Sequence, residues 1–531
     1  MVKKISTLAL AGLLALPALA SAGAGGAAAT SDMQAQVDAL TKQLNALKAQ
    51  MADIKSTQDQ KFEAFNEKAD KWDLASRIQL SGDFRARGDY YTADTPQYRP
   101  MYMPNGLYNP ALVAYGANVP MVPNDGSYVQ EARKYDNKTM FTNRFRLDMR
   151  AKALEDVEFK GRLAMYKAWG HQNNPISDVD GNPVMLMDGN ATRQPNDSIL
   201  RVDRAFVNWN NIGGVPVWFS IGRRPTTDGP PNHLRMNQDE RMATPSAYMD
   251  WPFDGVSVGY AYNSLFGLND APGRVRVCWG RGFEDGLQQD LNGNNLDDTD
   301  FAGVSWDIYK KGNRFAYLQS FMAFNVFNYP TSDTYDALGV AYASLMPREN
   351  VGNLLHTSAV YMDKYQNLNY FGSLGWSRTD PDSSGMFNTL GALGPVANTE
   401  SENGYAVHVG VRYDIPDSLF KLGAEYNHGS KYWIGMTPGH DDLYQSKLAT
   451  RGNVYEVYGI YDIPGGEAIS KYGKAFIRLG YQHYDYNYTG SGQWGMIPVD
   501  IDELMTDPNG AQMSTPIESA DQVYLTFEAA F

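Results

Sequence analysis

The hydrophobic pattern of the chain changes its period near Ser76. Before this residue the apolar positions fall three and four residues apart, whereas after it they alternate with polar positions. Spacing by three and four is typical of an amphipathic helix, and strict alternation is typical of a strand with one apolar face. The sequence therefore predicts a helical segment over 32–73 and an all-β region over 74–531.

The helical segment has the heptad spacing of a coiled coil. Its apolar positions step by four and three residues alternately, and they are Met33, Val37, Leu40, Leu44, Leu47, Met51 and Ile54. After an 11-residue step the stripe continues through Phe62, Phe65, Ala69 and Trp72, which is a stutter. A helix with such a stripe buries it by pairing with copies of itself, so we expect a short coiled coil. A single amphipathic helix lying on the base of the β region is the alternative interpretation.

The strands of the β region have one apolar face and one charged face. In 141–152, for example, Phe141, Phe145 and Leu147 alternate with arginines, and 77–90 repeats the pattern. The connections alternate in length. The short ones are 154–156, 310–313, 416–418 and 464–466, and the long ones are 92–138, 170–198, 224–250, 283–300, 378–403, 430–452 and 489–519. Short turns at one end and long loops at the other are typical of a transmembrane β-barrel.

The number of strands follows from counting these segments. About seventeen candidates lie between Ser76 and Phe531, and a single-chain barrel of this type has an even number. If 335–346 is a strand, only one strand fits between 353 and 377, so merging two candidates there gives sixteen. A strand hidden in a long loop would give eighteen. We expect an all-β, antiparallel barrel of about sixteen strands, with eighteen as the alternative.

The two ends of the chain carry sorting signals. Two lysines, an apolar stretch over 5–19 and small residues predict a signal peptide over 1–22, followed by a Gly/Ala-rich flexible leader over 23–31. No cysteine follows the apolar stretch, which argues against a lipid anchor. Apolar residues at every second position up to Phe531 resemble the signal that the barrel-assembly machinery recognises, and we assign it to Phe527 and Phe531. Together they predict the outer membrane of a Gram-negative bacterium, with the coiled coil in the periplasm.

Composition and charge limit the classes of function that the sequence allows. The 34 Tyr, 22 Phe and 10 Trp suit the aromatic girdles of a barrel in a membrane. The formal net charge of −14 argues against a nucleic-acid partner. Cys278 is the single cysteine, so no intrachain disulfide can form. Two enzyme-like matches, at 255–259 and 490–495, lack the strand-to-helix turn or the following helix that their chemistry requires. We therefore expect no enzymatic activity.

Two segments resemble the porin superfamily. Residues 200–209 followed by 220–225 resemble a strand pair of sixteen-stranded porins, and 420–433 is similar to their late strands. The order of signal peptide, coiled coil and barrel resembles a poorly characterised porin-like family of anaerobic Proteobacteria. The resemblance implies a trimeric barrel, as in the sucrose-type porins that also carry a periplasmic coiled coil.

The charged face of the early strands is the main candidate site. Charged side chains are costly against lipid, so these should line the lumen, where they would attract anions. The predicted pore-lining residues are Arg85, Arg87, Arg144, Arg146, Arg150, Lys152, Lys160, Arg162, Arg204, Arg223, Arg274 and Arg276. Alternatively, Asp83, Asp148, Glu158 and acidic loop residues neutralise them and leave a weakly selective pore.

Two loops carry further candidates. The loop 224–250 is stiffened by prolines and carries Arg235, Asp239, Glu240 and Arg241, so we expect it to constrict the pore. The longer loop 92–138 could fold inward instead. In the loop 290–300 the oxygen-bearing side chains are spaced as in a calcium loop, although the usual glycine and glutamate are missing. The candidate ligands are Asp290, Asn292, Asn294, Asp298 and Asp300. We expect no other cofactor.

These observations predict a porin through which small hydrophilic solutes diffuse, with a modest preference for anions. Outer-membrane lipid, the barrel-assembly machinery and two further copies of the chain are the expected partners. A second hypothesis is a structural barrel whose coiled coil tethers the outer membrane to peptidoglycan or to a periplasmic protein. A third is a barrel that sheathes an electron-transfer protein.

Overall fold

The protein is described from a computed structural model. The chain divides into two units, Met1–Ser76 and Arg77–Phe531. In the first unit the structure describes residues 35, 37–46, 48–49, 51–52, 55–56 and 63. In the second unit it describes all residues except 101–128, 171–191, 194, 196, 225–228, 239–245, 252, 266, 269, 285–295, 329–348, 392–393, 438–441, 443–445, 466–472 and 513–514. The predicted signal peptide and leader lie outside the described residues.

Every described residue of the first unit is helical and exposed. Among them, Val37, Leu40, Leu44 and Met51 expose more than half of their surface, as an unpartnered apolar stripe does. The predicted helix is confirmed at these described residues, whereas its full extent over 32–73 and its pairing into a coiled coil stay predictions. In the described residues, no helix combines the length and the apolar character needed to cross a membrane.

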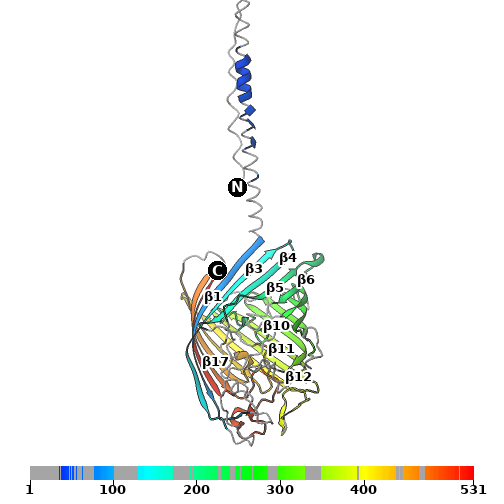
Figure 1. Ribbon diagram of the computed structural model, residues 1–531, viewed down its shortest axis with the longest axis vertical. Helices are drawn as coiled ribbons and strands as arrows, with labels where there is room; N and C mark the ends of the chain where they lie inside the picture. Colours follow the sequence, from blue (N-terminus) through cyan, green and yellow to red (C-terminus); the bar gives the residue numbers. More distant parts are fainter. Residues whose placement is uncertain are drawn as a thin grey trace, which may run out of the picture. The chain divides into compact units, whose positions relative to one another are not determined.

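The second unit is a closed barrel of sixteen antiparallel strands, counted over its described residues (Figure 1). In chain order the barrel strands are β1 (Ile78–Thr95), β3 (Arg133–Lys152), β4 (Val157–Ala168), β5 (Arg201–Trp209), β6 (Val217–Arg224), β7 (Phe253–Tyr262), β8 (Gly273–Phe283), β9 (Thr299–Lys311), β10 (Arg314–Phe327), β11 (Asn350–Tyr365), β12 (Leu368–Pro381), β15 (Asn403–Asp414), β16 (Phe420–Gly429), β17 (Gly452–Asp462), β18 (Lys474–Tyr486) and β20 (Ser519–Ala530). Each strand pairs with its neighbours in chain order, and β1 pairs with β20 to close the ring. The prediction of a closed, antiparallel barrel of sixteen strands is confirmed.

Seven smaller elements of the described residues are not part of the ring of strands. The short strands are β2 (Arg99–Pro100), β13 (Thr389–Gly391), β14 (Gly394–Val396) and β19 (Ala511–Gln512), and the short 3₁₀ helices are η2 (Ile212–Gly214), η3 (Lys447–Ala449) and η4 (Ile501–Glu503). β13 pairs with β14, and β19 runs parallel to β2.

One step in the strand count is wrong. The two segments that were merged between 353 and 377 belong to separate strands, β11 and β12, joined by a tight turn at 366–367. The count still reaches sixteen because the ring closes without 335–346, which lies outside the described residues. The connection between β10 and β11 is therefore another long one, 328–349.

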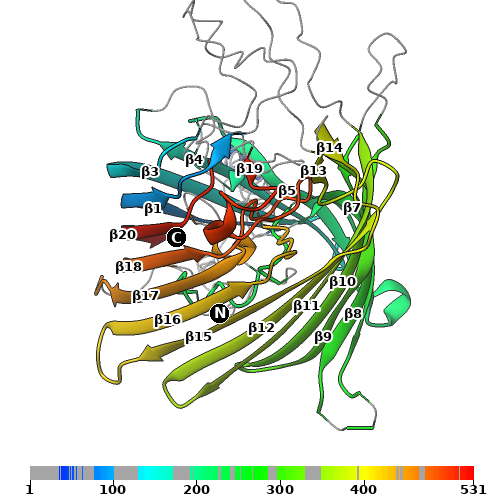
Figure 2. The same ribbon diagram turned by 90° about the horizontal axis from the view of Figure 1, so that it is seen from below.

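Long and short connections separate to the two ends of the barrel. Eight connections, beginning with 96–132 and ending with 487–518, lie at one end, and the shortest of them is 284–298. Seven turns lie at the other end, of which even the longest, 463–473, is shorter. Seen along the barrel, the strands β20, β18, β17, β16, β15, β12 and β11 follow one another around the wall (Figure 2). The long connections therefore form one rim, as the sequence predicts.

Alternating side chains point inward and outward along each strand. On β18, Arg478, Gln482 and Tyr484 are buried, whereas Leu479 and Tyr481 between them are exposed. The same alternation on β20 leaves Leu525 and the two predicted assembly-signal residues, Phe527 and Phe531, exposed. The ring thus has an apolar outer face and a polar inner face.

Part of the interior is filled by an apolar core. Side chains from five long connections pack with inward residues of β7, β9, β10 and β11. The core residues include Met249, Trp251, Leu296, Phe301, Phe321, Phe327, Phe387, Met436 and Trp494. These connections fold back into the barrel because there they can remove apolar side chains from water.

Inward glycines make room for aromatic rings on the neighbouring strands. A Cβ on Gly480 would lie 2.2 Å from the ring of Tyr524, and a Cβ on Gly423 would lie 2.1 Å from the ring of Tyr458. Gly459 differs, because its Cβ would meet only Leu422, at an ordinary distance of 3.7 Å.

We expect Gly480→Val to destabilise the barrel by displacing the ring of Tyr524. Overpacking of this kind costs about 1–3 kcal/mol. The measurement is the urea midpoint of unfolding of the refolded protein in detergent micelles. Gly459→Val is the matched control and should leave the midpoint unchanged. Equal midpoints for the two variants would contradict the packing role of Gly480.

Candidate functional site

The inward faces of β1, β3, β4 and β5 bring most of the predicted pore-lining residues together. Cross-strand pairing puts Arg85 opposite Arg144 and puts Arg162 opposite Arg204. The residues that alternation assigns to this surface, here called the arginine face, are Arg85, Arg87, Arg144, Arg146, Arg150, Lys152, Lys160, Arg162 and Arg204. Arg150, Lys152 and Lys160 lie next to the short turn 153–156 and are partly or fully exposed, whereas the others are buried.

Carboxylates are interleaved with these cations. Asp83 accepts hydrogen bonds from Nη2 of Arg144, at 3.1 Å, and from Nε of Arg146, at 2.7 Å. On neighbouring positions Arg87 pairs with Asp89, Arg162 with Asp148, and both Arg150 and Lys160 with Glu158. Burial makes such pairing necessary, because a charge that leaves water without a partner is costly.

Arg274 and Arg276 lie on the inward face of β8, but Arg223 was assigned to the wrong face. Arg223 shares the parity of the exposed Ile221 on β6, so it points outward, and there it pairs with Asp254, itself 62% exposed. Its neighbour Arg224 points inward and lies over the ring of Phe206, at 5.6 Å. Two adjacent arginines on a strand always face opposite ways, and the sequence pattern did not decide which one faces inward.

A stretch of the predicted constriction loop lies inside the barrel. Leu234 and Arg235 are buried, and their carbonyl groups accept hydrogen bonds from Arg412 of β15 and Arg478 of β18. The side chain of Asn237 donates a hydrogen bond to Asp462 of β17 at 2.6 Å. The stretch is therefore fastened to three strands of the wall, β15, β17 and β18. The other candidates of this loop, Asp239, Glu240 and Arg241, lie outside the described residues.

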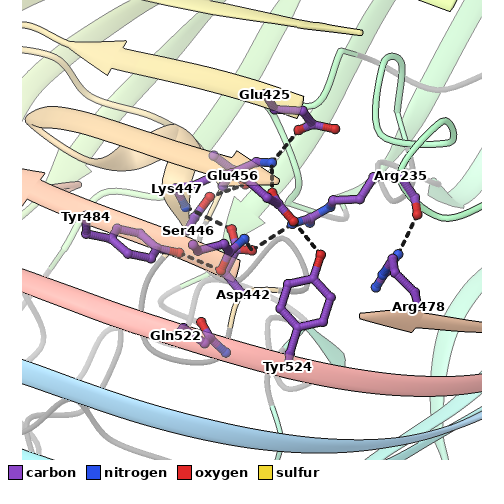
Figure 3. Close-up of polar contacts among 12 residues, drawn as sticks. Arg235, Glu425, Asp442, Ser446, Lys447, Glu456, Arg478, Tyr484, Gln522 and Tyr524 are labelled. Carbon is purple, nitrogen blue, oxygen red and sulfur yellow. Dashed lines mark hydrogen bonds and ion pairs between the residues drawn. The ribbon is translucent and has the colours of Figure 1, made fainter. Parts of the chain in front are cut away.

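Arg235 is the centre of a buried ionic cluster (Figure 3). Its Nη1 contacts Glu456 of β17 at 3.0 Å and Asp442 of the connection 430–451 at 3.1 Å. Burial alone would lower the pKa of the Arg235 guanidinium, but the neighbouring carboxylates of Glu456 and Asp442 raise it above its ordinary value. Arg235 therefore keeps its charge, and the charge fixes the loop.

Lys447 links the second inward connection to the wall through Glu456 and a further carboxylate. Its ammonium group contacts both Glu425 of β16 and Glu456 of β17. The hydroxyl of Tyr524 on β20 donates a hydrogen bond to Glu456 at 2.5 Å, and His408 of β15 contacts Glu425 at 3.1 Å. We call Arg235, Asp442, Lys447, Glu425 and Glu456 the loop clamp. It holds the connections 225–252 and 430–451 against the wall formed by β15–β18.

The sequence predicted only Arg235 among these five residues. Glu425 and Glu456 could have been found, because they share the parity of buried positions on their strands and such acids need cationic partners. Asp442 and Lys447 lie in a connection, where no periodicity indicates direction.

The calcium prediction rests mostly on residues that the structure does not describe. Asp290, Asn292 and Asn294 lie outside the described residues, while Asp298 and Asp300 both form ion pairs with Arg281. Within the described residues, no group of three or more His, Cys, Asp or Glu side chains could hold a metal ion. Calcium binding stays a prediction.

Comparison with known proteins places the chain in a family. Residues 134–531 match the family described as Protein of unknown function (DUF3373). The chain belongs to the DUF3373 family. No curated protein matches the sequence of this DUF3373 member.

The fold of the DUF3373 chain is similar to those of several solved outer-membrane proteins. OmpF of Salmonella typhi, solved with daunomycin, has 10% sequence identity and a TM-score of 0.40, with 86% of this chain and 97% of that chain covered. The anion-selective porin from Comamonas acidovorans has 11% identity and a TM-score of 0.40, with 86% and 99% covered. The outer membrane channel DcaP of Acinetobacter baumannii has 12% identity and a TM-score of 0.38, with 86% and 97% covered.

We expect Glu456→Gln to release the loop stretch around Arg235. Breaking one side of a buried ion pair costs about 3–5 kcal/mol, and even half of that would speed cleavage after Arg235 by more than about tenfold. The measurement is limited trypsin digestion of the refolded barrel, followed by mass spectrometry. Glu158→Gln removes a buried carboxylate far from this loop and is the control. Protection equal to that of the unchanged protein would argue against the loop clamp.

Proposed function

We propose that this DUF3373 protein is an outer-membrane channel through which small hydrophilic solutes diffuse. The observation that carries the proposal is the division of the ring into an apolar outer face and a charged inner face. Outer residues such as Leu479, Val523 and Leu525 suit lipid, whereas charges against lipid would cost about 2–4 kcal/mol each at the bilayer midplane. Charges that face inward instead suit a water-filled path.

A modest preference for anions follows from the balance of charge on the arginine face. Along 83–89, 142–152 and 157–166 the inward cations are Arg85, Arg87, Arg144, Arg146, Arg150, Lys152, Lys160 and Arg162. The inward acids of the same stretches are Asp83, Asp89, Asp148 and Glu158. Arg204 of β5 is a ninth cation, and Asp203 of β5 and Glu528 of β20, which pair with Arg162 and Arg144, are two further acids. Nine cations minus six acids leave an excess of three positive charges. An excess positive charge along a narrow path raises the local concentration of anions.

The loop clamp supports a restricted path rather than a wide one. It fixes two connections inside the barrel along β15–β18, and the apolar core occupies the side of β7–β11. Solutes would then pass along the arginine face, which lies on the remaining side of the ring. In this proposal the charged side chains that solutes meet belong to one wall.

The helical unit supports a second proposal. Its exposed heptad stripe suits pairing with two other copies, so that the DUF3373 protein would be a homotrimer whose coiled coil lies in the periplasm. The same segment could tether the barrel to peptidoglycan or to a periplasmic protein. A plugged barrel with a tether is the alternative to the channel, and the two inward connections are the feature that favours it.

Single-channel recording distinguishes the channel from the plugged barrel. We expect the purified, refolded protein to give stable current steps in a planar lipid bilayer, with a reversal potential under a salt gradient that favours chloride. The double variant Arg144→Gln/Arg146→Gln should shift this potential towards potassium. A folded protein without current steps would contradict the channel, and a potassium preference in the unchanged protein would contradict the role of the arginines.

The trimer is tested by the mass of the protein in detergent. We expect the full chain to sediment as three copies and a variant with Leu40→Asp and Leu44→Asp to sediment with fewer, because a charge in the stripe opposes pairing. Analytical ultracentrifugation provides the masses, and Lys42→Asp, which lies off the stripe, is the control. A barrel that stays trimeric in the double variant would assign assembly to the barrel rather than to the helix.

A further inference from the structure

Two buried hydroxyl groups on neighbouring strands of the inner wall have no hydrogen-bond partner in the part of the chain that the structure describes. Ser220 of β6 and Ser257 of β7 face the lumen, and their exposed fractions are 0% and 1%. The oxygen of each is buried without a partner among the described residues. Buried polar groups are nearly always hydrogen-bonded, and an exception indicates a missing water, ion or ligand. These two side chains are therefore placed to bind something that is not part of the protein.

The two serines belong to one row across three strands. Ser220 pairs directly with Ser257, and Ser257 pairs directly with Cys278 of β8. Directly opposed side chains on neighbouring antiparallel strands have Cβ atoms about 4.5–5.5 Å apart. We call Ser220, Ser257 and Cys278 the hydroxyl row. Its two hydroxyl groups are close enough to donate to one small ligand.

Arginines flank the hydroxyl row at both ends. Arg276 lies on β8 two residues before Cys278, and Arg224 lies on β6 four residues beyond Ser220. Inward Gly222, Gly255 and Gly280 form the row between Ser220 and Arg224, so no side chain separates them there. The guanidinium of Arg224 is within electrostatic range of Arg276, Arg274 and the thiol of Cys278. The arginine side chains thus act on the space over the hydroxyl row.

The positive charge at this row exceeds the negative charge. Arg274 forms an ion pair with Asp307, whereas no described carboxylate forms an ion pair with Arg224 or Arg276. Arg276 instead contacts the hydroxyl of Tyr317 at 3.4 Å, and Nη1 of Arg224 is buried without a partner among the described residues. Elsewhere on the inner wall acids are interleaved with the cations, and here glycine and serine occupy their places.

We infer that the hydroxyl row is a binding site for a small oxyanion. Arg224 and Arg276 would supply the charge, and Ser220 and Ser257 would donate hydrogen bonds to its oxygens. Guanidinium groups favour carboxylate and phosphate because their N–H donors match two oxygens at once. The inference deepens the proposed channel function, on which it rests for access of the solute. Such a site would bind oxyanions more tightly than chloride, because a single chloride ion cannot offer two separate oxygens to the paired N–H donors of a guanidinium group.

Cys278 allows the site to be tested without any transport assay. It is the single cysteine of the chain, it is partly exposed at the edge of the apolar core, and it belongs to the hydroxyl row itself. The experiment measures its rate of modification in the refolded barrel by an anionic reagent, sulfonatoethyl methanethiosulfonate, and by a cationic one, trimethylammonioethyl methanethiosulfonate. With each rate divided by the rate of the same reagent with a small thiol in solution, we expect the anionic reagent to react at least about tenfold faster, because two guanidinium groups act on the approach.

Competition by oxyanions identifies the ligand class. Sodium phosphate and sodium succinate, added separately, should slow the anionic reagent in a saturable manner, whereas sodium chloride at equal ionic strength should not. Protection by phosphate alone assigns the site to phosphates, and protection by succinate alone assigns it to carboxylates. Arg276→Gln should reduce both the rate ratio and the protection about tenfold, and Ser220→Ala with Ser257→Ala should weaken protection while the rate ratio stays high.

One variant is the control, and three outcomes would contradict the site. Arg223→Gln removes an arginine from the outward face of the same β6 strand and should change neither quantity. Equal rates for the two reagents, protection that survives Arg276→Gln, or a thiol that neither reagent reaches would each overturn the site. Current steps in a bilayer without oxyanion protection would leave the channel standing and the site refuted. Protection by oxyanions without current steps would support the site and refute the channel.

Discussion

A closed ladder gives each side chain of a strand only two directions, into the lumen or away from it. The pairing of β1 with β20 completes the ring, so this constraint holds on every strand and no edge relaxes it. Charges that the outer face cannot carry have to face inward, where space and water are limited. Each inward charge therefore needs an oppositely charged partner nearby. The position of Asp83 between Arg144 and Arg146 follows from that requirement.

The same constraint explains why the long connections fold into the barrel in two different ways. On the inner face of β15–β18 the wall carries the acids Glu425 and Glu456, which form ion pairs with Arg235 and Lys447 of the connections. On the inner face of β7–β11 the wall carries aromatic and aliphatic side chains, and apolar side chains of the connections pack against them to form the apolar core. Each connection is thus held by the chemistry of the wall that it meets.

Much of this architecture could be predicted from the sequence because the inner and outer faces repeat every second residue. The strands around Arg144, Arg162 and Leu525 were identified by that period alone. The period fails where a turn is too tight to interrupt it, as at 366–367 between β11 and β12. It also gives no direction to residues in connections, so Asp442 and Lys447 of the loop clamp could not be predicted from it.

A difference of one position along a strand decides whether a side chain faces into or out of the ring, and therefore which groups it contacts. Arg223 and Arg224 differ by one position, yet the first pairs with an exposed acid outside the ring and the second acts on the hydroxyl row inside it. On the arginine face, acids on the same and adjacent strands offset most of the positive charge that the arginines bring. On β6–β8, glycine and serine stand where those acids would be, so the charge of Arg224 and Arg276 stays uncompensated by ion pairs within the described residues. In the proposed channel, selection of anions would therefore depend less on the number of arginines along the wall than on the places where their neighbours are small and uncharged.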